Sequence, residues 1–292
     1  MFIGIKLETG FSEQSVYRRL YGDCEILHHL KGLGFSAVET PVSPETDPET
    51  LREHVIRCRE AGLCVSLHPY CEGTICDPTF FIIEDDNPCR NYFQRLLLSA
   101  AEISEIQQSP VVVNIHPAAG SSTIARRDLF DRSVSLLSWA RQWCCRNAPD
   151  VHVVAELQFG PDAGEDKQRV GDTYDELLQL VTGSKVRACW DFGHAYYNTK
   201  RFDVPLYPSE ALLEQIGHVH CHDVCQGDHC PLIYYEVPWR EFIRSLIEKD
   251  FNETIIIEVP PSAFLAAGGL ENVNRSLEAL VSWIEQCEQK TY

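Results

Sequence analysis

Four segments of the sequence each carry a metal-ligating side chain at or near the end of a run of apolar residues. Glu156 follows VHVVA, Asp191 follows VRACW, His220 lies within IGHVHCHD, and Glu258 follows TIII. Carboxylate oxygens and imidazole nitrogens are ligands that divalent metal ions accept from proteins. Brought together, three carboxylates and one imidazole would make a mixed oxygen and nitrogen site suited to Mn²⁺, Mg²⁺, Co²⁺ or Zn²⁺.

Four more histidines lie near the ends of apolar runs or close to a carboxylate. His68 follows LCVSL, His116 follows VVVNI, His194 comes three residues after Asp191, and His229 is adjacent to an aspartate. By their position at strand ends, His68, His116 and His194 are further candidate ligands. Taken singly, a strand histidine is more typical of the core and a strand-end glutamate of a solvated end. The prediction of a metal site therefore depends on the joint occurrence of Glu156, Asp191, His220 and Glu258 at strand ends.

Strand patterns and helix patterns alternate along the whole chain. Apolar runs of four to eight residues predict strands, and each is followed by a segment with helical spacing of apolar residues. Eight such units, at about 36-residue intervals, favour parallel strands with right-handed crossovers. The predicted strands are 2–7, 37–40, 63–67, 111–115, 151–157, 186–190, 216–223 and 254–259; the predicted helices are 13–33, 48–61, 89–107, 123–146, 172–180, 209–215, 238–249 and 270–286.

Eight strand-helix units are what a closed barrel requires. An open, doubly wound sheet would usually show a glycine-rich phosphate turn after its first strand, whereas Glu8-Thr9-Gly10-Phe11-Ser12 follows here. The fold class predicted is therefore α/β, a single (β/α)8 TIM barrel formed by one domain, residues 1–292.

In such a barrel the carboxyl ends of all strands share one face, where polar residues form sites. Glu156, Asp191, His220 and Glu258 are separated by 35, 29 and 38 residues, close to one barrel unit each. We therefore expect a ring of ligands from four consecutive strands. His218 and His222 share a face with His220 by strand alternation, so the residues alone do not decide which imidazole joins the ring.

Charge and hydropathy narrow the class of partner. With 43 acidic and 25 basic residues, the formal net charge is −18, which opposes binding to nucleic acids and anionic membranes. No run of 18 apolar residues is present, and MFIGIKLETG does not resemble a signal peptide. We expect a cytoplasmic protein without a membrane partner that acts on a small molecule; the oligomeric state stays open, a homo-oligomer included.

The thirteen cysteines do not form a pattern typical of disulfide-rich proteins. Their number is odd, and no CxxC pair is present, so reduced thiols are expected. Cys221, Cys225 and Cys230 lie among several histidines and could in principle hold a thiolate-rich zinc site. Buried or loop thiols without a special role are the preferred interpretation.

Several segments resemble the signature strands of xylose isomerase-like TIM barrels. They are ELQ at 156–158, WDFGHA at 190–195, HVHCHD at 218–223 and IIIEV at 255–259. This superfamily includes sugar and sugar-phosphate isomerases and epimerases, hydroxypyruvate isomerase and the endonuclease IV branch of abasic-site nucleases. The resemblance implies that Glu156, Asp191, His220 and Glu258 are metal ligands and that His194 contacts the substrate or a second metal.

By this resemblance the activity is that of a divalent-metal-dependent isomerase or epimerase acting on a carbohydrate. Glu156 and Glu258 would serve as the acid and base around an enediolate. The chain departs from the ketose epimerases between residues 224 and 237, which lack the arginine and the glycine-rich turn that usually precede Pro238-Trp239. The substrate contact made by that arginine is therefore in doubt.

The alternative is a zinc-dependent phosphodiester hydrolase of the endonuclease IV type. His68, His116 and the Asp228-His229 pair resemble the additional zinc ligands of that branch. Its late aspartate and histidine are separated by one residue, however, whereas Asp228 and His229 are adjacent. The net charge of −18 and the few basic residues in the loops also disfavour a DNA substrate.

Overall fold

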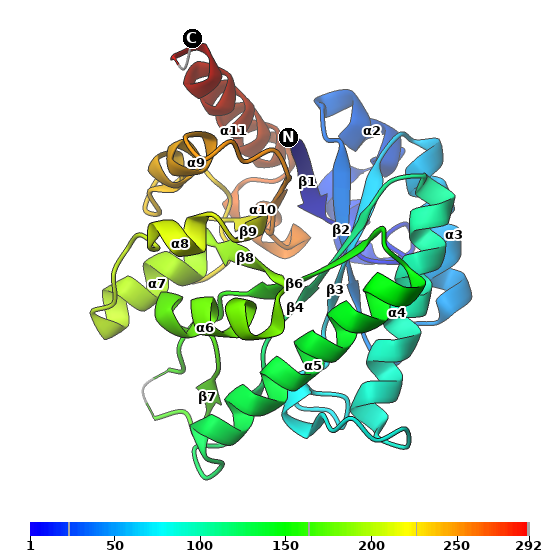
Figure 1. Cartoon of the computed structure of the whole chain (residues 1–292). Helices are drawn as coiled ribbons and strands as arrows, with labels where there is room; N and C mark the ends of the chain where they lie inside the picture. Colours follow the sequence, from blue (N-terminus) through cyan, green and yellow to red (C-terminus); the bar gives the residue numbers. More distant parts are fainter. Residues whose placement is uncertain (23, 163, 226, 291–292) are drawn as a thin grey trace.

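Eight parallel strands close into a barrel in the computed structural model, which describes residues 1–22, 24–162, 164–225 and 227–290. The order around the barrel is β1-β10-β9-β8-β6-β4-β3-β2, and β2 pairs with β1 to complete it (Figure 1). The predicted (β/α)8 TIM barrel is confirmed. Its strands are β1 (Phe2–Lys6), β2 (Ala37–Val42), β3 (Cys64–Pro69), β4 (Val111–Ile115), β6 (Val151–Glu156), β8 (Arg187–Asp191), β9 (Ile216–Cys221) and β10 (Thr254–Ile257).

Helices surround the barrel, and a short antiparallel pair, β5 (Ala119–Gly120) and β7 (Gln168–Arg169), lies in the connecting loops (Figure 1). Several helices begin where the sequence provides a cap: the Asp47 carboxylate accepts the backbone N–H of Thr50 at 2.9 Å, and proline follows in the first helical position. The helices are α1 (Ser15–Tyr21), α2 (Ile26–Leu33), α3 (Pro48–Glu60), α4 (Pro88–Gln107), α5 (Arg126–Asn147), α6 (Tyr174–Ser184), α7 (Phe192–Phe202), α8 (Glu210–Leu213), α9 (Trp239–Ile247), α10 (Pro261–Ala267) and α11 (Leu270–Lys290), with a 3₁₀ turn, η1, at Pro78–Phe80.

The helix prediction was wrong in three places. Residues 13–33 form two helices, α1 and α2, because α1 ends at Gly22 with φ 63°; the apolar spacing continues across the break and hides it. Residues 192–202 form helix α7 and not the expected loop, since Asp191 caps it by accepting the backbone N–H of His194 at 2.7 Å. Helix α10 was not predicted.

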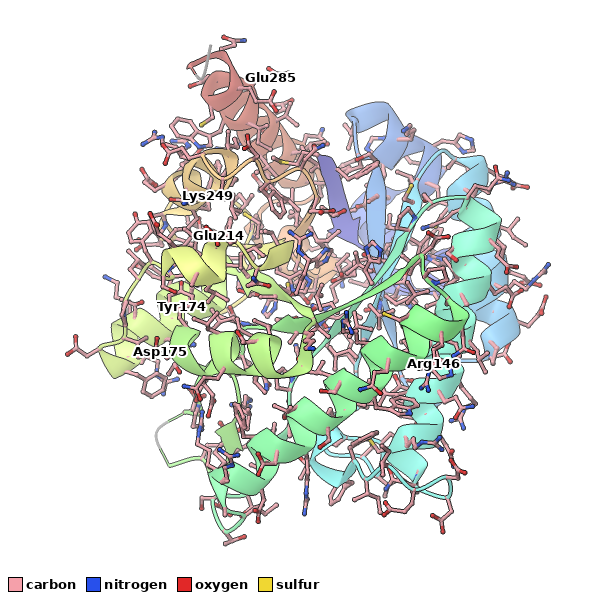
Figure 2. The ribbon with its side chains drawn as sticks, viewed as in Figure 1. Arg146, Tyr174, Asp175, Glu214, Lys249 and Glu285 are labelled. Atoms are coloured by element: carbon pink, nitrogen blue, oxygen red, sulfur yellow. The ribbon has the colours of Figure 1, made fainter. Side chains whose placement is uncertain are left out.

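An aromatic cluster packs β8 against the helices on either side of it in the sequence. Trp190 is buried on β8 and lies 4.8 Å, between ring centroids, from both Phe192 and Phe242. Its indole N–H donates to the hydroxyl of Tyr174, which Figure 2 labels at the start of α6, at 3.1 Å. This packing fixes the strand that ends in Asp191. None of the described helices combines the length and apolar character needed to cross a membrane.

Candidate metal centre

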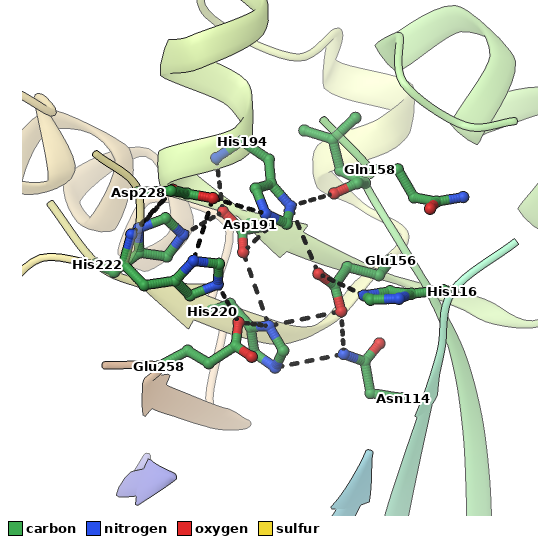
Figure 3. Close-up of polar contacts among 12 residues, drawn as sticks. Asn114, His116, Glu156, Gln158, Asp191, His194, His220, His222, Asp228 and Glu258 are labelled. Atoms are coloured by element: carbon green, nitrogen blue, oxygen red, sulfur yellow. Dashed lines mark hydrogen bonds and ion pairs between the residues drawn. The ribbon is translucent and has the colours of Figure 1, made fainter. Parts of the chain in front are cut away.

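The four predicted ligands come together at the carboxyl end of the barrel (Figure 3). Glu156 and Asp191 are the last residues of β6 and β8, His220 lies near the end of β9, and Glu258 follows β10 directly. The Nδ1 atom of His220 lies 2.8 Å from Glu258 Oε2, 3.5 Å from Glu156 Oε2 and 3.7 Å from Asp191 Oδ2. We call these four residues the ligand ring.

The ligand ring has the donor set and the unpaired atoms that a divalent ion needs. Its ligand atoms all lie within 4.8 Å of one another, and all four residues are buried. Within the described part of the chain, no group forms a hydrogen bond with Glu156 Oε1, Asp191 Oδ2, His220 Nδ1 or Glu258 Oε2. Buried polar atoms without partners are rare and costly, and a bound cation would satisfy all four. The residues present therefore fit a divalent metal.

The carboxylates of the ligand ring are held in their charged form. Burial alone would raise the pKa of Glu156, Asp191 and Glu258, but neighbouring imidazoles outweigh it and hold all three pKa values well below the usual range. His116 has the largest such effect on Glu156, His194 on Asp191 and His220 on Glu258. Metal ligands must be deprotonated, and these three carboxylates meet that condition at neutral pH.

Glu39 on β2 lies beneath the ligand ring and orients His220. It is 1% exposed, and its two carboxylate oxygens accept from His220 Nε2 at 2.6 Å and His218 Nε2 at 2.8 Å. The protonated Nε2 leaves His220 Nδ1 free to face the ring, the usual arrangement of a carboxylate behind a metal-binding histidine. The structure thus places His220 in the ring and His218 below it. Sequence reasoning missed Glu39, although a carboxylate inside the apolar run AVET was a usable signal.

A second group of potential ligands extends from Asp191. His194, His222 and His229 surround it, and their nitrogens lie within 4.8 Å of one another and of the Asp191 carboxylate. His222 Nε2 lies 3.1 Å from Asp191 Oδ1, and the rings of His222 and His229 stack at 4.2 Å. Asp228 joins this group through His229 Nδ1 at 3.1 Å (Figure 3 labels Asp228 and His222).

His68 and His116 lie beside Glu156. His68 Nε2 is 3.4 Å from Glu156 Oε2, and His116 Nε2 is 3.3 Å from Glu156 Oε1. Burial lowers the pKa of His68 to about 4, and its Nδ1 donates to the carbonyl of Asn114 at 2.9 Å, so Nε2 keeps a lone pair toward Glu156. The four histidines predicted outside the ring, His68, His116, His194 and His229, each lie within 3.5 Å of a ring carboxylate, and their role stays a prediction. Among the residues that the structure describes, no potential metal-binding group includes a cysteine.

A cavity of about 300 Å³ opens beside the ring and is lined in part by Glu156, His194 and Glu258. On its wall, the hydroxyl of Tyr70 donates to Glu258 Oε1 at 2.8 Å, and Lys6 Nζ lies 2.6 Å from that hydroxyl. The Glu258 carboxylate is thus held from one side by Tyr70 and from the other by His220. Sequence reasoning also missed Lys6 and Tyr70, although Lys6 is the last residue of β1 and occupies a site position by the strand-end rule.

Comparisons with known proteins agree with this architecture. A family model described as a xylose isomerase-like TIM barrel matches residues 27–287, whereas no curated protein sequence matches the chain. A solved D-tagatose 3-epimerase-like protein has a TM-score of 0.67 at 17% identity and covers 100% of both chains. A D-psicose 3-epimerase with D-tagatose from Clostridium cellulolyticum H10 has a TM-score of 0.66 at 12% identity, over 98% of this chain and 99% of that one.

An AP endonuclease of family 2 from Brucella melitensis is also similar, with a TM-score of 0.61 at 13% identity. The alignment covers 92% of this chain and 99% of that one. At these identities the likeness to solved structures concerns the fold.

Proposed function

Since the chain belongs to the xylose isomerase-like TIM barrel family, we propose that it is a divalent-metal-dependent isomerase or epimerase of a sugar or sugar phosphate. The observation that carries this proposal is the ligand ring, whose four buried ligand atoms converge beside a cavity at the carboxyl end of the barrel. Solved structures named as a D-tagatose 3-epimerase-like protein and a D-psicose 3-epimerase share the fold and support a carbohydrate substrate.

In this proposal Glu156 and Glu258 transfer the protons. When bound, a divalent ion polarises a ketose carbonyl and stabilises negative charge on its oxygen. Either Glu156 or Glu258 accepts the proton from the carbon next to that carbonyl, which leaves an enediolate. The other returns a proton, either to the opposite face of the same carbon in epimerisation or to the former carbonyl carbon in isomerisation, in which case the neighbouring hydroxyl proton also moves to the former carbonyl oxygen. Both glutamates are ionised at neutral pH, so the one that returns a proton first takes it up from solvent.

The two glutamates differ in their hydrogen-bond partners and neighbours. Glu258 Oε1 accepts a hydrogen bond from Tyr70, and Lys6 lies 3.3 Å from the same oxygen. Glu156 instead accepts from the amide of Asn114 and adjoins His116, which is part of the cavity wall.

The size of the cavity also bears on the substrate. A cavity of about 300 Å³ is at the small end of ligand pockets, which suits a single monosaccharide.

Deuterium exchange tests the proposal. We expect the protein, loaded separately with Mn²⁺, Mg²⁺, Co²⁺ or Zn²⁺, to convert at least one ketose or ketose phosphate into an isomer in D₂O. The product should carry deuterium at the reacting carbon, detected by NMR, and a chelator should abolish conversion. Conversion unaffected by exhaustive metal removal would contradict the metal dependence, and no conversion across free and phosphorylated ketopentoses, ketohexoses and hydroxypyruvate would contradict the substrate class.

Metal-dependent phosphodiester hydrolysis is a second candidate, and the additional histidines favour it. His68 and His116 beside Glu156, and His222 and His229 beside Asp191, provide nitrogen donors for ions beyond the one in the ligand ring. The similar fold named as an AP endonuclease agrees with this candidate. The net charge of −18 opposes a DNA substrate, so we place hydrolysis second.

A further inference from the structure

A second cavity, of about 420 Å³, lies at the end of the barrel opposite the ligand ring. It is lined by residues at or near the amino ends of the strands, among them Val112 of β4, Val151 of β6 and Arg187 of β8. Val151 and Glu156 are the first and last residues of β6, which separates the two sites by about 16 Å at roughly 3.3 Å per residue. The second cavity is therefore distinct from the candidate metal centre.

The charge of this cavity is opposite to that of the whole molecule. Arg141 of α5, Lys185 just after α6, and Arg187 line it, and Glu253 is the single carboxylate among its described lining residues. These four groups sum to a charge of +2, in a chain whose net charge is −18. The remaining wall is mainly apolar, with four valines from β4 and β6. A few charged groups on an apolar wall are typical of small-molecule sites of this volume.

Arg187 is held in one orientation at this cavity. Its Nη1 lies 2.6 Å from Glu253 Oε1, and its Nη2 donates to the carbonyl of Ile216. The side chain crosses Gly217, where an added Cβ would come within 3.0 Å of Arg187 Cβ, Nε and Cδ. Neither Arg141 nor Lys185 forms an ion pair with any residue that the structure describes. Two cations at the cavity thus lack a partner of opposite charge.

We propose that this cavity binds a small organic phosphate monoester whose remaining part has a face that packs on the apolar wall. A phosphate monoester carries a charge of about −1.5 to −2 at neutral pH, which matches the +2 of the lining residues. Arginine forms paired hydrogen bonds to phosphate oxygens, and the valines provide a surface for that face. A long polyanion is disfavoured, because the rest of the molecule would repel it.

Isothermal titration with AMP, ribose 5-phosphate and adenosine tests this site. AMP combines a phosphate monoester with a planar base, whereas each of the other probes lacks one of the two. We expect saturable one-to-one binding of AMP, and binding of the other probes at least about tenfold weaker. Arg141→Gln and Lys185→Gln should each weaken AMP binding about tenfold or more, since a hydrogen bond to a charged group contributes that much.

Two further variants show whether AMP binds at this cavity or elsewhere on the protein. Arg146, labelled on α5 in Figure 2, is exposed and does not line the cavity, so Arg146→Gln should bind AMP as the parent does. Asp191→Asn alters the ligand ring and should also leave AMP binding unchanged, whatever the catalytic activity is. No saturable AMP binding at millimolar concentration, binding that survives both Arg141→Gln and Lys185→Gln, or binding lost in Asp191→Asn would each overturn the proposal.

Discussion

The position of a single carboxylate, Glu39, determines how His220 meets the ligand ring. Glu39 accepts from His220 Nε2 and from His218 Nε2, and Ser66 Oγ donates to it at 3.2 Å. Burial would raise the pKa of Glu39, but the two histidines outweigh it and lower that pKa. A charged carboxylate behind a metal-binding imidazole fixes its tautomer and increases its basicity. Metal affinity should therefore depend on a residue that does not contact the metal.

The Glu39→Gln variant tests this dependence. Glutamine keeps the volume and a hydrogen-bond acceptor but removes the negative charge. We expect metal affinity to fall about 10- to 100-fold, measured by competition with a fluorescent chelator, while circular dichroism shows a folded protein. Glu45→Gln, at an exposed position after β2, is the matched control and should bind as the parent does. Parental affinity in a folded Glu39→Gln protein would contradict the role given to Glu39.

At the scale of elements, helix α7 begins directly at the end of β8 and brings its first turn against His222. An added Cβ at Gly193 would overlap the imidazole of His222, so only glycine permits this approach. Gly193→Ala should therefore displace His222 from Asp191 and destabilise the fold by about 1–3 kcal/mol. Chemical denaturation of parent and variant measures the effect.

Gly183 in helix α6 provides the control for Gly193. A Cβ there would meet its nearest atom, a methyl group of Val134, at 3.7 Å, which is ordinary contact. Gly183→Ala should be neutral or stabilise the protein by up to about 1 kcal/mol, because alanine favours helix. Equal effects of the two substitutions on stability would show that crowding against His222 does not cause the destabilisation of Gly193→Ala.

The packing of α3 on β2 gives the fold a pH dependence through His54. Burial lowers the pKa of His54 from 6.5 to about 4, and its Nε2 lies 2.9 Å from Thr40 Oγ1. Because the folded state disfavours the charged imidazole, its contribution to stability is complete above pH 6.5 and declines as the pH falls toward 4. Between pH 7.5 and pH 5 we expect a loss of about 2 kcal/mol from this group.

Urea denaturation across that pH range tests the His54 prediction. His54→Gln has no titrating group at this position, so its stability should depend less on pH than that of the parent. His28→Gln is the control, because the His28 side chain is 72% exposed, and it should retain the parental dependence. If the stability of His54→Gln depends on pH as that of the parent does, His54 is not the source of the pH dependence.

For the whole molecule, net charge is the property that most limits the choice of substrate. A charge of −18 repels DNA, and the repulsion is strongest at low ionic strength, where screening is weakest. Cleavage of an abasic-site duplex should therefore be weak or absent, and weaker at about 20 mM than at about 150 mM salt. Efficient cleavage with less enzyme than duplex would make hydrolysis the preferred function.

The barrel could be predicted because the alternation of strands and helices depends on local residue types. Eight strand-helix units are also the number that a closed (β/α)8 barrel requires. The same reasoning predicted that Glu156 and Asp191, the candidate ligands at the ends of β6 and β8, lie close together, since strand ends meet at one face. It missed Glu39, Lys6 and Tyr70, whose roles arise from barrel closure: Glu39 reaches His220 across 181 positions in the sequence. Helix α7 was missed because its cap, Asp191, was interpreted only as a ligand.

The most direct test of the central claim, a metal centre with two proton-transferring glutamates, is the turnover of the Glu156→Gln and Glu258→Gln variants. Each keeps an oxygen ligand and almost the same volume but cannot exchange a proton. We expect kcat to fall about 10²- to 10⁴-fold with a much smaller change in KM, and the exposed-site control Glu105→Gln to match the parent. If both variants retain the metal and turn over the identified substrate at nearly parental rates, the paired-glutamate mechanism is contradicted.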